Sequence, residues 1–331
     1  MRSPDRPDGG APSRREFVAL GIGAFVVAAV PAWARPRTRL VRRRIPLMGT
    51  IAEIGVVARS RARAEEAIDR ALAELRRVEA LMSRFRADSD VGKANRLALR
   101  RPVVVSPETG LVLGAALRWA VATDGSFDPC LLGAQRLWNV EARHRPPPDA
   151  EVARFAGRGL YRHLELGDAP GGTAVRFRAP DVGLDLGGIA KGYGVDRAVR
   201  ALRDFGVRSG LVNVGGDLFA LGASEDGDPW EVGIRSPADP WALAGRVRVT
   251  DRAVATSGDY ERYFDYGGRR YHHILDPATG APRRAPRHSL TVVADACMEA
   301  DAAGTALFGL GRPQAEALLG RLDPGASLVA A

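Results

Sequence analysis

The sequence predicts an α+β fold in which mixed, mostly antiparallel sheets pack against helices. Between residues 210 and 258, four strand-like segments follow one another, separated by Gly and Asp turns: GLVNVGGDLFALG, WEVGIR, GRVRVT and RAVATSG. A doubly wound parallel sheet would need a helical crossover after each strand, and this run has none in its pattern. Helical patterns flank the run at 64–82 and 298–322. Strands that succeed one another directly indicate antiparallel pairing.

The first half of the chain alternates strands and helices. TIAEIGVVA at 50–58 predicts a strand, and apolar residues spaced three and four apart predict an amphipathic helix over 64–82. SRFRADSD opens a polar loop, and RPVVVS predicts a short strand. Pro107 starts the next helix, which ends at about Thr123, because proline suits the first turn of a helix.

The second half begins with three strands, expected near 161–166, 173–178 and 182–186. The helix that follows has its apolar stripe at Val195, Val199, Leu202 and Phe205. After the run of four strands, RYHHILDPATG predicts a strand and a turn, and SLTVVA predicts a further strand. Two helices follow, in MEADAAGTALFGLG and RPQAEALLGRL. The tail 323–331 is expected to be loose or to form a short final strand.

The first 34 residues match an export signal. SRREFVA has the twin-arginine pattern, and an uncharged stretch from 17 to 34 ends in AWA, a small-x-small cleavage site. The apolar part before Pro31 is short for a bilayer span, although a retained membrane anchor is the alternative. We therefore expect a protein exported by the twin-arginine route to the periplasm or another extracytoplasmic space, with no stable membrane insertion after cleavage.

The basic charge is local. Of the formal net charge of +9, residues 35–44 (RPRTRLVRRR) contribute six arginines and no acid, and the chain after them is nearly balanced. This segment predicts a solvated basic arm, with a weak role at an anionic membrane surface as the alternative. A nucleic-acid-binding face would spread its charge over a domain, so no nucleic-acid partner is expected. The two cysteines, Cys130 and Cys297, are too few for a disulfide framework and are expected as core thiols, although one bridge is possible in an oxidising compartment.

Two stretches carry chemistry-bearing residues in a suggestive pattern. Asp301 and Thr305 lie four apart on a predicted helix, so their oxygens share one face and could bind a hard divalent cation. A solvated or capping Asp301 beside a packed Thr305 is the alternative. In LDLGGIAKGYGVDRAV (184–199), two glycines and Lys191 stand at a strand-to-helix turn, where backbone amides favour an anion. It is no P-loop, because Ser or Thr does not follow the lysine, and a tight turn without a ligand is the alternative.

A single histidine stands out near the end of the strand run. His273 belongs to HHILDPATG, a region rich in turns, and the chain has only 5 histidines. An imidazole is the side chain best suited to accept a proton near neutral pH, although a lone histidine often has only a structural role.

The order of the motifs resembles one family. LMGT, MSRFRADSD, GSFDP, LDLGGIAKGYGVDRA, LVNVGGDLFALG, ATSGDYERYF, YHHILDPATGAP and ADAAGTALFGLG resemble the ApbE-type FAD:protein FMN transferases over residues 45–312. The resemblance implies a single domain over 45–322, related to the tunnelling fold, with a small appended subdomain. It also implies a reaction in which FAD is cleaved with Mg²⁺ present, FMN passes to a Thr or Ser hydroxyl of an acceptor flavoprotein, and AMP leaves.

The resemblance also implies the site residues. Asp301, Thr305 and the Gly188 carbonyl would hold Mg²⁺, and His273 would be the base. The residues expected to line FAD are Met48, Phe85, Ser126, Phe127, Asp128, Asp185, Lys191 and Ile274. Cys130, the segment LLGAQRLW and the loop SDVGKAN depart from the family pattern near the expected FAD rim. Two alternatives remain open: an FAD pyrophosphatase that gives FMN and AMP, and a non-enzymatic periplasmic flavin-binding protein.

Overall fold

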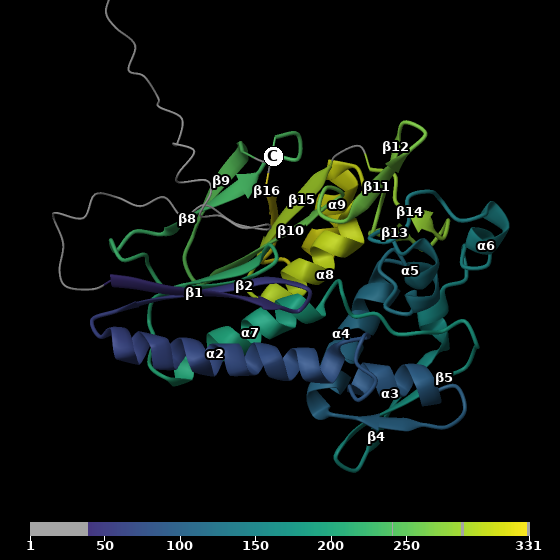
Figure 1. The fold of residues 1–331 in the computed structure, drawn as a ribbon, viewed down its shortest axis with the longest axis horizontal. Helices are drawn as coiled ribbons and strands as arrows, with labels where there is room; N and C mark the ends of the chain where they lie inside the picture. Colours follow the sequence, from purple (N-terminus) through teal and green to yellow (C-terminus); the bar gives the residue numbers. More distant parts are fainter. Residues whose placement is uncertain (1–38, 240, 286–287, 330–331) are drawn as a thin grey trace, which may run out of the picture.

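A computed structural model describes residues 39–239, 241–285 and 288–329 (Figure 1). The expected signal peptide, 1–34, lies outside the described residues. The main sheet has seven strands in the order β1-β2-β6-β7-β10-β15-β16, and every neighbouring pair is antiparallel. Its strands are β1 Arg39–Leu47, β2 Thr50–Ala58, β6 Gly210–Val214, β7 Asp217–Leu221, β10 Arg252–Gly258, β15 Ser289–Ala294 and β16 Ser327–Val329. The predicted α+β class and the antiparallel pairing are confirmed.

Three helices cover one face of this sheet: α2 Arg61–Met82, α7 Ala190–Asp204 and α8 Cys297–Leu307. Figure 1 shows α2 and α7 running side by side beneath the sheet, with α8 next to α7. The predicted stripe of α2 is buried along its length, from Ala64 through Ile68 and Leu75 to Met82. Ser60 starts this helix because its Oγ accepts a hydrogen bond from the Arg63 amide.

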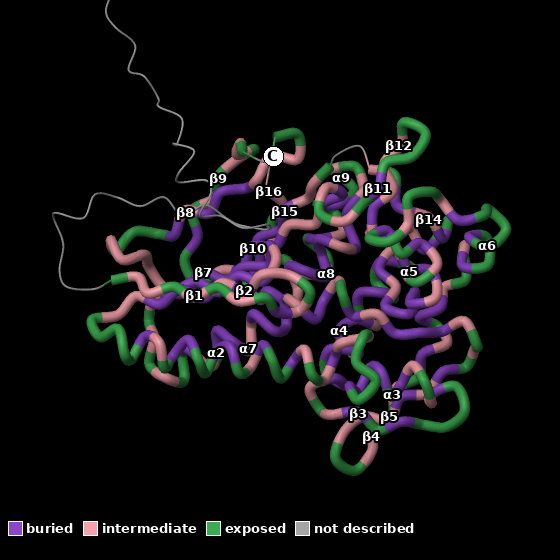
Figure 2. Tube along the Cα trace, in the orientation of Figure 1, coloured by how far each residue is buried: buried purple, intermediate pink, exposed green. Residues whose placement is uncertain are grey.

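The other face of the sheet is covered by a hairpin of β8 Trp230–Arg235 and β9 Leu243–Val249. A second apolar cluster lies there, formed by Leu211, Leu218, Ala220, Trp230, Val232, Val249, Val254 and Val293. Figure 2 shows the result: buried positions follow β7, β10 and α8 through the interior. Both faces of β6 and β7 are therefore buried, which explains their continuous apolar sequences.

A smaller part contains a three-stranded sheet of order β3-β5-β4, at the lower right of Figure 1. Its strands are β3 Val103–Val105, β4 Leu164–Ala169 and β5 Gly172–Phe177. Its helices are α3 Asp90–Leu97, α4 Pro107–Ala122, α5 Leu132–Trp138, α6 Asp149–Ala153 and the 3₁₀ turn Leu160–His163. Two short hairpins, β11 Tyr263–Tyr266 with β12 Arg269–His272 and β13 Leu275–Asp276 with β14 Ala281–Pro282, and the helix α9 Arg312–Leu322 complete the fold.

The basic arm differs from its expectation. Within 35–44, residues 39–44 form the first part of β1, the edge strand of the main sheet, where Arg39, Arg42 and Arg44 are exposed; residues 35–38 lie outside the described part of the chain. Its arginines have partners: Arg43 pairs with Glu65 and Asp69, and Arg44 pairs with Glu53. Charged side chains on an edge strand keep other chains from pairing with it, so the arginines suit this position.

The segment 182–186 is not a strand, contrary to the prediction. Only an isolated bridge between Leu131 and Gly183 remains there. The side-chain amide of Asn95, on α3, donates to the Leu184 carbonyl at 3.0 Å and accepts from the Leu184 amide at 2.6 Å. A distant side chain therefore takes both backbone groups that a strand would pair.

Other differences concern short elements. The helix α3 lies in the stretch expected as a polar loop, where the Ser89 Oγ caps it by accepting from the Gly92 amide at 2.8 Å. The tail forms β16, so the alternative of a short final strand is confirmed. Both cysteines are free and buried. Within residues 39–329 as far as they are described, no helix has the length and hydrophobicity needed to cross a membrane.

Candidate active site

The glycine turn of 184–192 lies directly against α8. A Cβ atom on Gly188 would sit 2.8 Å from the Thr305 Oγ1, and one on Gly192 would sit 2.3 Å from the Cys297 carbonyl oxygen. Only glycine permits such close approach between the start of α7 and its neighbour. Asp301 and Thr305, one turn apart on α8, share one face of the helix, as their spacing predicted, and this face contacts the turn.

Asp301 is buried and bound on two sides. Its Oδ2 accepts a hydrogen bond from the Gly192 amide at 3.0 Å, and its Oδ1 lies 3.5 Å from the Lys191 Nζ. Lys191 also donates to a second carboxylate, that of Asp217. The side chains of Asp217 and Asp301 are 4% exposed, against 26% for Lys191. The cluster contains two carboxyl groups and one ammonium, so it has a net negative charge when both acids are ionised.

The charged groups in this cluster shift one another's pKa values. Burial raises the pKa of Asp301, because water no longer solvates the charged form. Burial and the Asp301 carboxylate also raise the pKa of Asp217. Burial alone would lower the pKa of Lys191, but the two carboxylates raise it above its ordinary value. The lysine therefore stays protonated and offsets one of the two acids.

Asp217 is missing from the predicted site set, although the sequence holds a signal for it. It follows Gly215 and Gly216, which have φ values of 60° and 99° and form a two-residue hairpin turn between β6 and β7. An acid that begins a strand buried on both faces needs a partner. Lys191, 26 residues away in the chain, supplies it.

His273 lines a cavity of about 210 Å³ together with Phe85, and their placement in one pocket agrees with the prediction. The rest of the lining is Arg84, Leu132, Gln135, Arg136, Asn139, Val140, Glu141 and Arg262. Gln135 donates to the His273 carbonyl at 3.1 Å, and the His273 amide donates to the Arg262 carbonyl at 3.2 Å. The Phe85 ring is 80% exposed at this pocket, under the guanidinium of Arg84 at 4.4 Å.

The ring of His273 is set for one tautomer. Its Nδ1 lies 3.4 Å from the Arg262 carbonyl oxygen, which can only accept, so Nδ1 holds the proton and Nε2 keeps its lone pair. Burial and the charges of Arg262 and His272 lower the pKa of His273 to about 3. The imidazole is therefore neutral at physiological pH.

The neighbouring histidine has a structural role. The Nε2 of His272 lies 2.8 Å from the Arg283 carbonyl, and its Nδ1 accepts from the Ile274 amide at 3.2 Å. Both ring nitrogens are thus used to fold the segment around His273.

Asp185 joins the pocket to the glycine turn. Its Oδ2 pairs with Arg84 at 3.3 Å, and its Oδ1 accepts from the Gly187 amide at 3.0 Å. Met48 lies near α7: a Cβ atom on Gly194, in that helix, would sit 3.4 Å from the Met48 sulfur. The Met48 amide donates to Glu79 at 2.7 Å.

The other residues predicted to line FAD are buried or hydrogen-bond to backbone groups, and they do not form an open surface. Phe127 and Ile274 are buried. The Ser126 Oγ donates to the Ala306 carbonyl at 2.8 Å, near the end of α8. Asp128 accepts from the amides of Cys130 at 2.8 Å and Tyr161 at 3.2 Å, while its burial raises its pKa to about 6.

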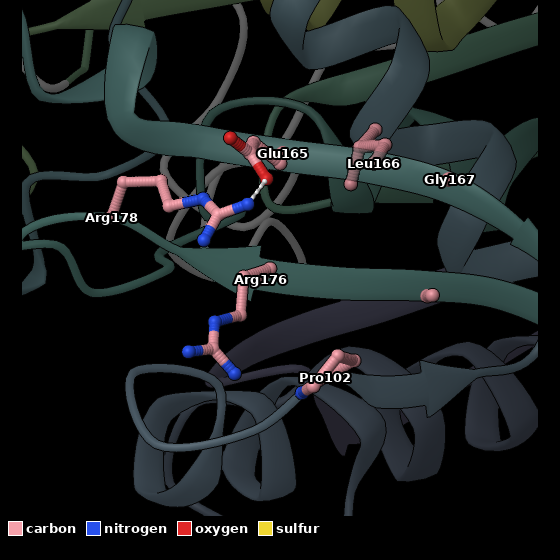
Figure 3. Close-up of a pocket in the computed structure, with 7 residues that line it drawn as sticks. Pro102, Glu165, Leu166, Gly167, Arg176 and Arg178 are labelled. Carbon is pink, nitrogen blue, oxygen red and sulfur yellow. Dashed lines mark ion pairs between the residues drawn. The ribbon is translucent and has the colours of Figure 1, made fainter.

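A second hollow, of about 390 Å³, lies away from these residues on the three-stranded sheet (Figure 3). Figure 3 shows Arg178 turned toward Glu165, with which it pairs at 2.6 Å, and Arg176 pointing toward Pro102. None of the predicted site residues lines it. Among the described residues no cluster of three or more His, Cys, Asp or Glu side chains could hold a metal. The expected magnesium site has a single carboxylate, so it is not a cluster of that kind.

Comparison with known proteins identifies the family. The model of the ApbE family matches residues 48–329. The FAD:protein FMN transferase of Treponema pallidum is 35% identical over 305 residues, covering 88% of this chain and 84% of that protein. That of Vibrio cholerae is 35% identical over 256 residues, covering 76% and 74%.

Solved structures show the same fold. The crystal structure of the ApbE protein from Thermotoga maritima has a TM-score of 0.78 at 32% identity and covers 88% of this chain and 93% of its own. The flavin transferase ApbE from Vibrio cholerae has a TM-score of 0.76 at 29% identity, covering 89% and 97%. The family match, the relatives and the fold agree with the motifs of the glycine turn and of α8: the chain belongs to the ApbE family.

Proposed function

We propose that this chain transfers the FMN moiety of FAD to a Ser or Thr hydroxyl of an acceptor protein in a Mg²⁺-dependent reaction that releases AMP. One observation carries the proposal: the glycine turn lies against α8, with Thr305 at Gly188 and Asp301 bonded to the Gly192 amide. The curated relatives named FAD:protein FMN transferase support the same activity.

The residues present fit a magnesium ion. Asp301, Thr305 and the Gly188 carbonyl offer hard oxygen ligands, which Mg²⁺ prefers. With both carboxyl groups ionised, the cluster of Asp301, Asp217 and Lys191 has one more negative charge than positive, which would attract a cation. When bound, Mg²⁺ would neutralise charge on the diphosphate of FAD and so ease the departure of AMP.

The chain's own groups supply binding and orientation. The start of α7 has no side-chain cap, and the positive end of its helix dipole favours an anionic diphosphate, although the Gly192 amide and the Lys191 ammonium already bind Asp301. The exposed Phe85 ring offers an apolar face to a flavin or adenine.

His273 moves the proton. Its Nε2 accepts the proton of the acceptor hydroxyl, while a new oxygen–phosphorus bond forms and the bond to the AMP phosphate breaks. A pKa of about 3 makes the imidazole a weak base in the free protein. The negative charge of a bound diphosphate nearby raises that pKa, because it favours the protonated ring.

The test uses the purified chain with FAD, MgCl₂ and a candidate acceptor. Flavin that stays on the acceptor after denaturation supports transfer, and free FMN formed without any acceptor supports the pyrophosphatase alternative. FAD that stays intact with and without MgCl₂ supports a binding protein. Asp301→Asn should abolish transfer. Glu299→Gln, on the same helix and bonded to Trp119 at 2.6 Å, is the matched control and should retain it.

We also propose export by the twin-arginine route, on the basis of SRREFVA and the cleavage site at 32–34. Expression with Arg14 and Arg15 both changed to Lys should leave the chain in the cytoplasm. A mature N-terminus that still contains the first 34 residues would show that the segment stays as an anchor.

A further inference from the structure

The helix α8 has little side-chain bulk to fix its position. Between Asp301 and Thr305 it has only Ala302, Ala303 and Gly304, and a Cβ on Gly304 would sit 2.8 Å from the Ser257 Oγ. Small residues let backbones approach closely, but their short side chains interdigitate little with the neighbouring elements. They therefore oppose a shift of α8 along its own axis only weakly. Besides the mid-helix bond between the Gly192 amide and Asp301, hydrogen bonds at its two ends hold α8 along its axis.

At the N-terminal end the cap comes from another helix. The N-cap residue of α8, Ala296, makes no side-chain cap bond. Instead Asp196, on α7, accepts from the Cys297 amide at 2.8 Å and from the Met298 amide at 2.9 Å. A carboxylate at a helix N-terminus is also favoured by the helix dipole. This bond fixes the start of α8 to the helix that contains Lys191 and Gly192.

At the C-terminal end of α8, a buried guanidinium fixes the helix to its neighbours. Arg283 is 8% exposed, and its Nη1 donates to the carbonyls of Ala306 at 3.0 Å and Phe308 at 2.7 Å. Its Nη2 donates to the Ser126 carbonyl at 2.6 Å. All hydrogen bonds of this guanidinium go to backbone carbonyls, and a positive charge at a helix C-terminus is favourable.

The backbone of Arg283 reaches the segment of the catalytic histidine. Its amide donates to the Ile274 carbonyl at 2.9 Å, and its carbonyl contacts the His272 ring at 2.8 Å. One residue thus connects the end of α8, the Ser126 loop and the residues on both sides of His273.

We propose that Asp196 and Arg283 are positioning residues that clamp α8 from its two ends and so set Asp301 and Thr305 against the glycine turn. The proposal rests on the proposed function. A slip of one residue along a helix moves every side chain by about 1.5 Å, enough to misplace a ligand. Arginine is needed at 283, because its planar fork reaches carbonyls of two segments, whereas an ammonium is a single point charge.

The experiment compares clamp variants with chemically matched controls elsewhere in the fold. The clamp variants are Arg283→Met, Arg283→Lys and Asp196→Asn. Arg252→Lys is one control, since Arg252 donates to the Gly325 carbonyl. Asp90→Asn is the other, since Asp90 accepts from the Ser106 amide at 2.9 Å at the start of α4.

The first readout is the MgCl₂ concentration that gives half of the maximal transfer rate, measured on the folded fraction. Arg283→Met should raise it about tenfold or more and lower kcat by a similar factor, while the dissociation constant of FAD changes by less than about threefold. Arg283→Lys should recover part of the loss. Whatever their effect on Tm, the two controls should leave the MgCl₂ requirement within about twofold.

The second readout needs neither metal nor activity. Amide hydrogen exchange over 301–308 should be faster in Arg283→Lys and Asp196→Asn than in wild type, and unchanged in the two controls. Wild-type exchange and a wild-type MgCl₂ requirement in the clamp variants would overturn the proposal. Failure of wild type to transfer flavin would instead overturn the proposed function, and exchange would still decide whether the clamp exists.

Discussion

Lys191→Met probes the charge balance of the site most directly. The ammonium lies between two carboxylates, each 4% exposed, and methionine keeps most of its length without its charge. Leaving buried charges without a partner costs about 3–5 kcal/mol. A chain of this size loses roughly 2–3 °C of Tm per kcal/mol, so Tm should fall by roughly 6–15 °C near neutral pH.

The loss should depend on pH with a defined sign. Burial already raises the pKa values of Asp217 and Asp301 above their unfolded values, and removal of Lys191 raises them further. The folded variant then binds more protons than the unfolded chain, so its stability falls as pH rises from about 4 through the raised pKa values. The deficit relative to wild type should be small at about pH 4–5 and largest at about pH 8.

The assay is thermal unfolding across this pH range with and without MgCl₂. If Asp301 binds the cation, MgCl₂ should recover more stability in the variant than in wild type, because the cation replaces the missing charge. Lys93→Met is the matched control: Lys93 is exposed, and these two are the only lysines in the sequence. A Tm deficit that does not change with pH would refute the reasoning, because it would show that the two carboxylates are not held as buried charges.

Three further predictions follow. His273→Ala should still bind FAD, measured by flavin fluorescence, but should lose about 100-fold or more in transfer, since it removes the base; transfer at the wild-type rate would refute this role. Gly192→Ala should destabilise the protein by about 1–3 kcal/mol in urea unfolding, because its Cβ would meet α8 backbone at 2.3 Å, whereas Gly114→Ala, with nothing within 4 Å, should gain up to about 1 kcal/mol. Equal effects of the two would contradict the close packing of α7 on α8. Burial raises the pKa of Asp128 to about 6, so its contribution to stability is fully present below about pH 4 and is lost as pH rises through 6; Asp128→Asn should flatten that slope, and an unchanged slope would place its origin elsewhere.

The helical periodicity of the sequence predicted those parts of the site that lie within a single helix. Asp301 and Thr305 share a face because the helical repeat alone determines it. The stripe of α2 was predictable for the same reason, because every third or fourth residue is apolar. The likeness of HHILDPATG to the family pattern also indicated His273, whose pocket the structure shows.

The parts that the sequence did not predict depend on contacts between distant residues. Asn95, 89 positions away, hydrogen-bonds both backbone groups of Leu184 within an apolar run that the sequence predicted as a strand. Asp217 belongs to the site only because Lys191 reaches it. Arg283 resembles any surface arginine in the sequence, and only the fold shows that its charge is buried against carbonyls. The arginines of β1 suggested solvation, while their acidic partners lie on β2 and α2.

The pair of hydrogen bonds between Asn95 and Leu184 has a structural consequence. Because the Asn95 side chain on α3 hydrogen-bonds both backbone polar groups of Leu184, the residue that leads into the glycine turn is attached to the smaller part of the molecule. It is not paired with a strand of the seven-stranded sheet. Removal of that side chain, as in Asn95→Ala, would leave the Leu184 amide and carbonyl without these hydrogen bonds at the residue that leads into the glycine turn.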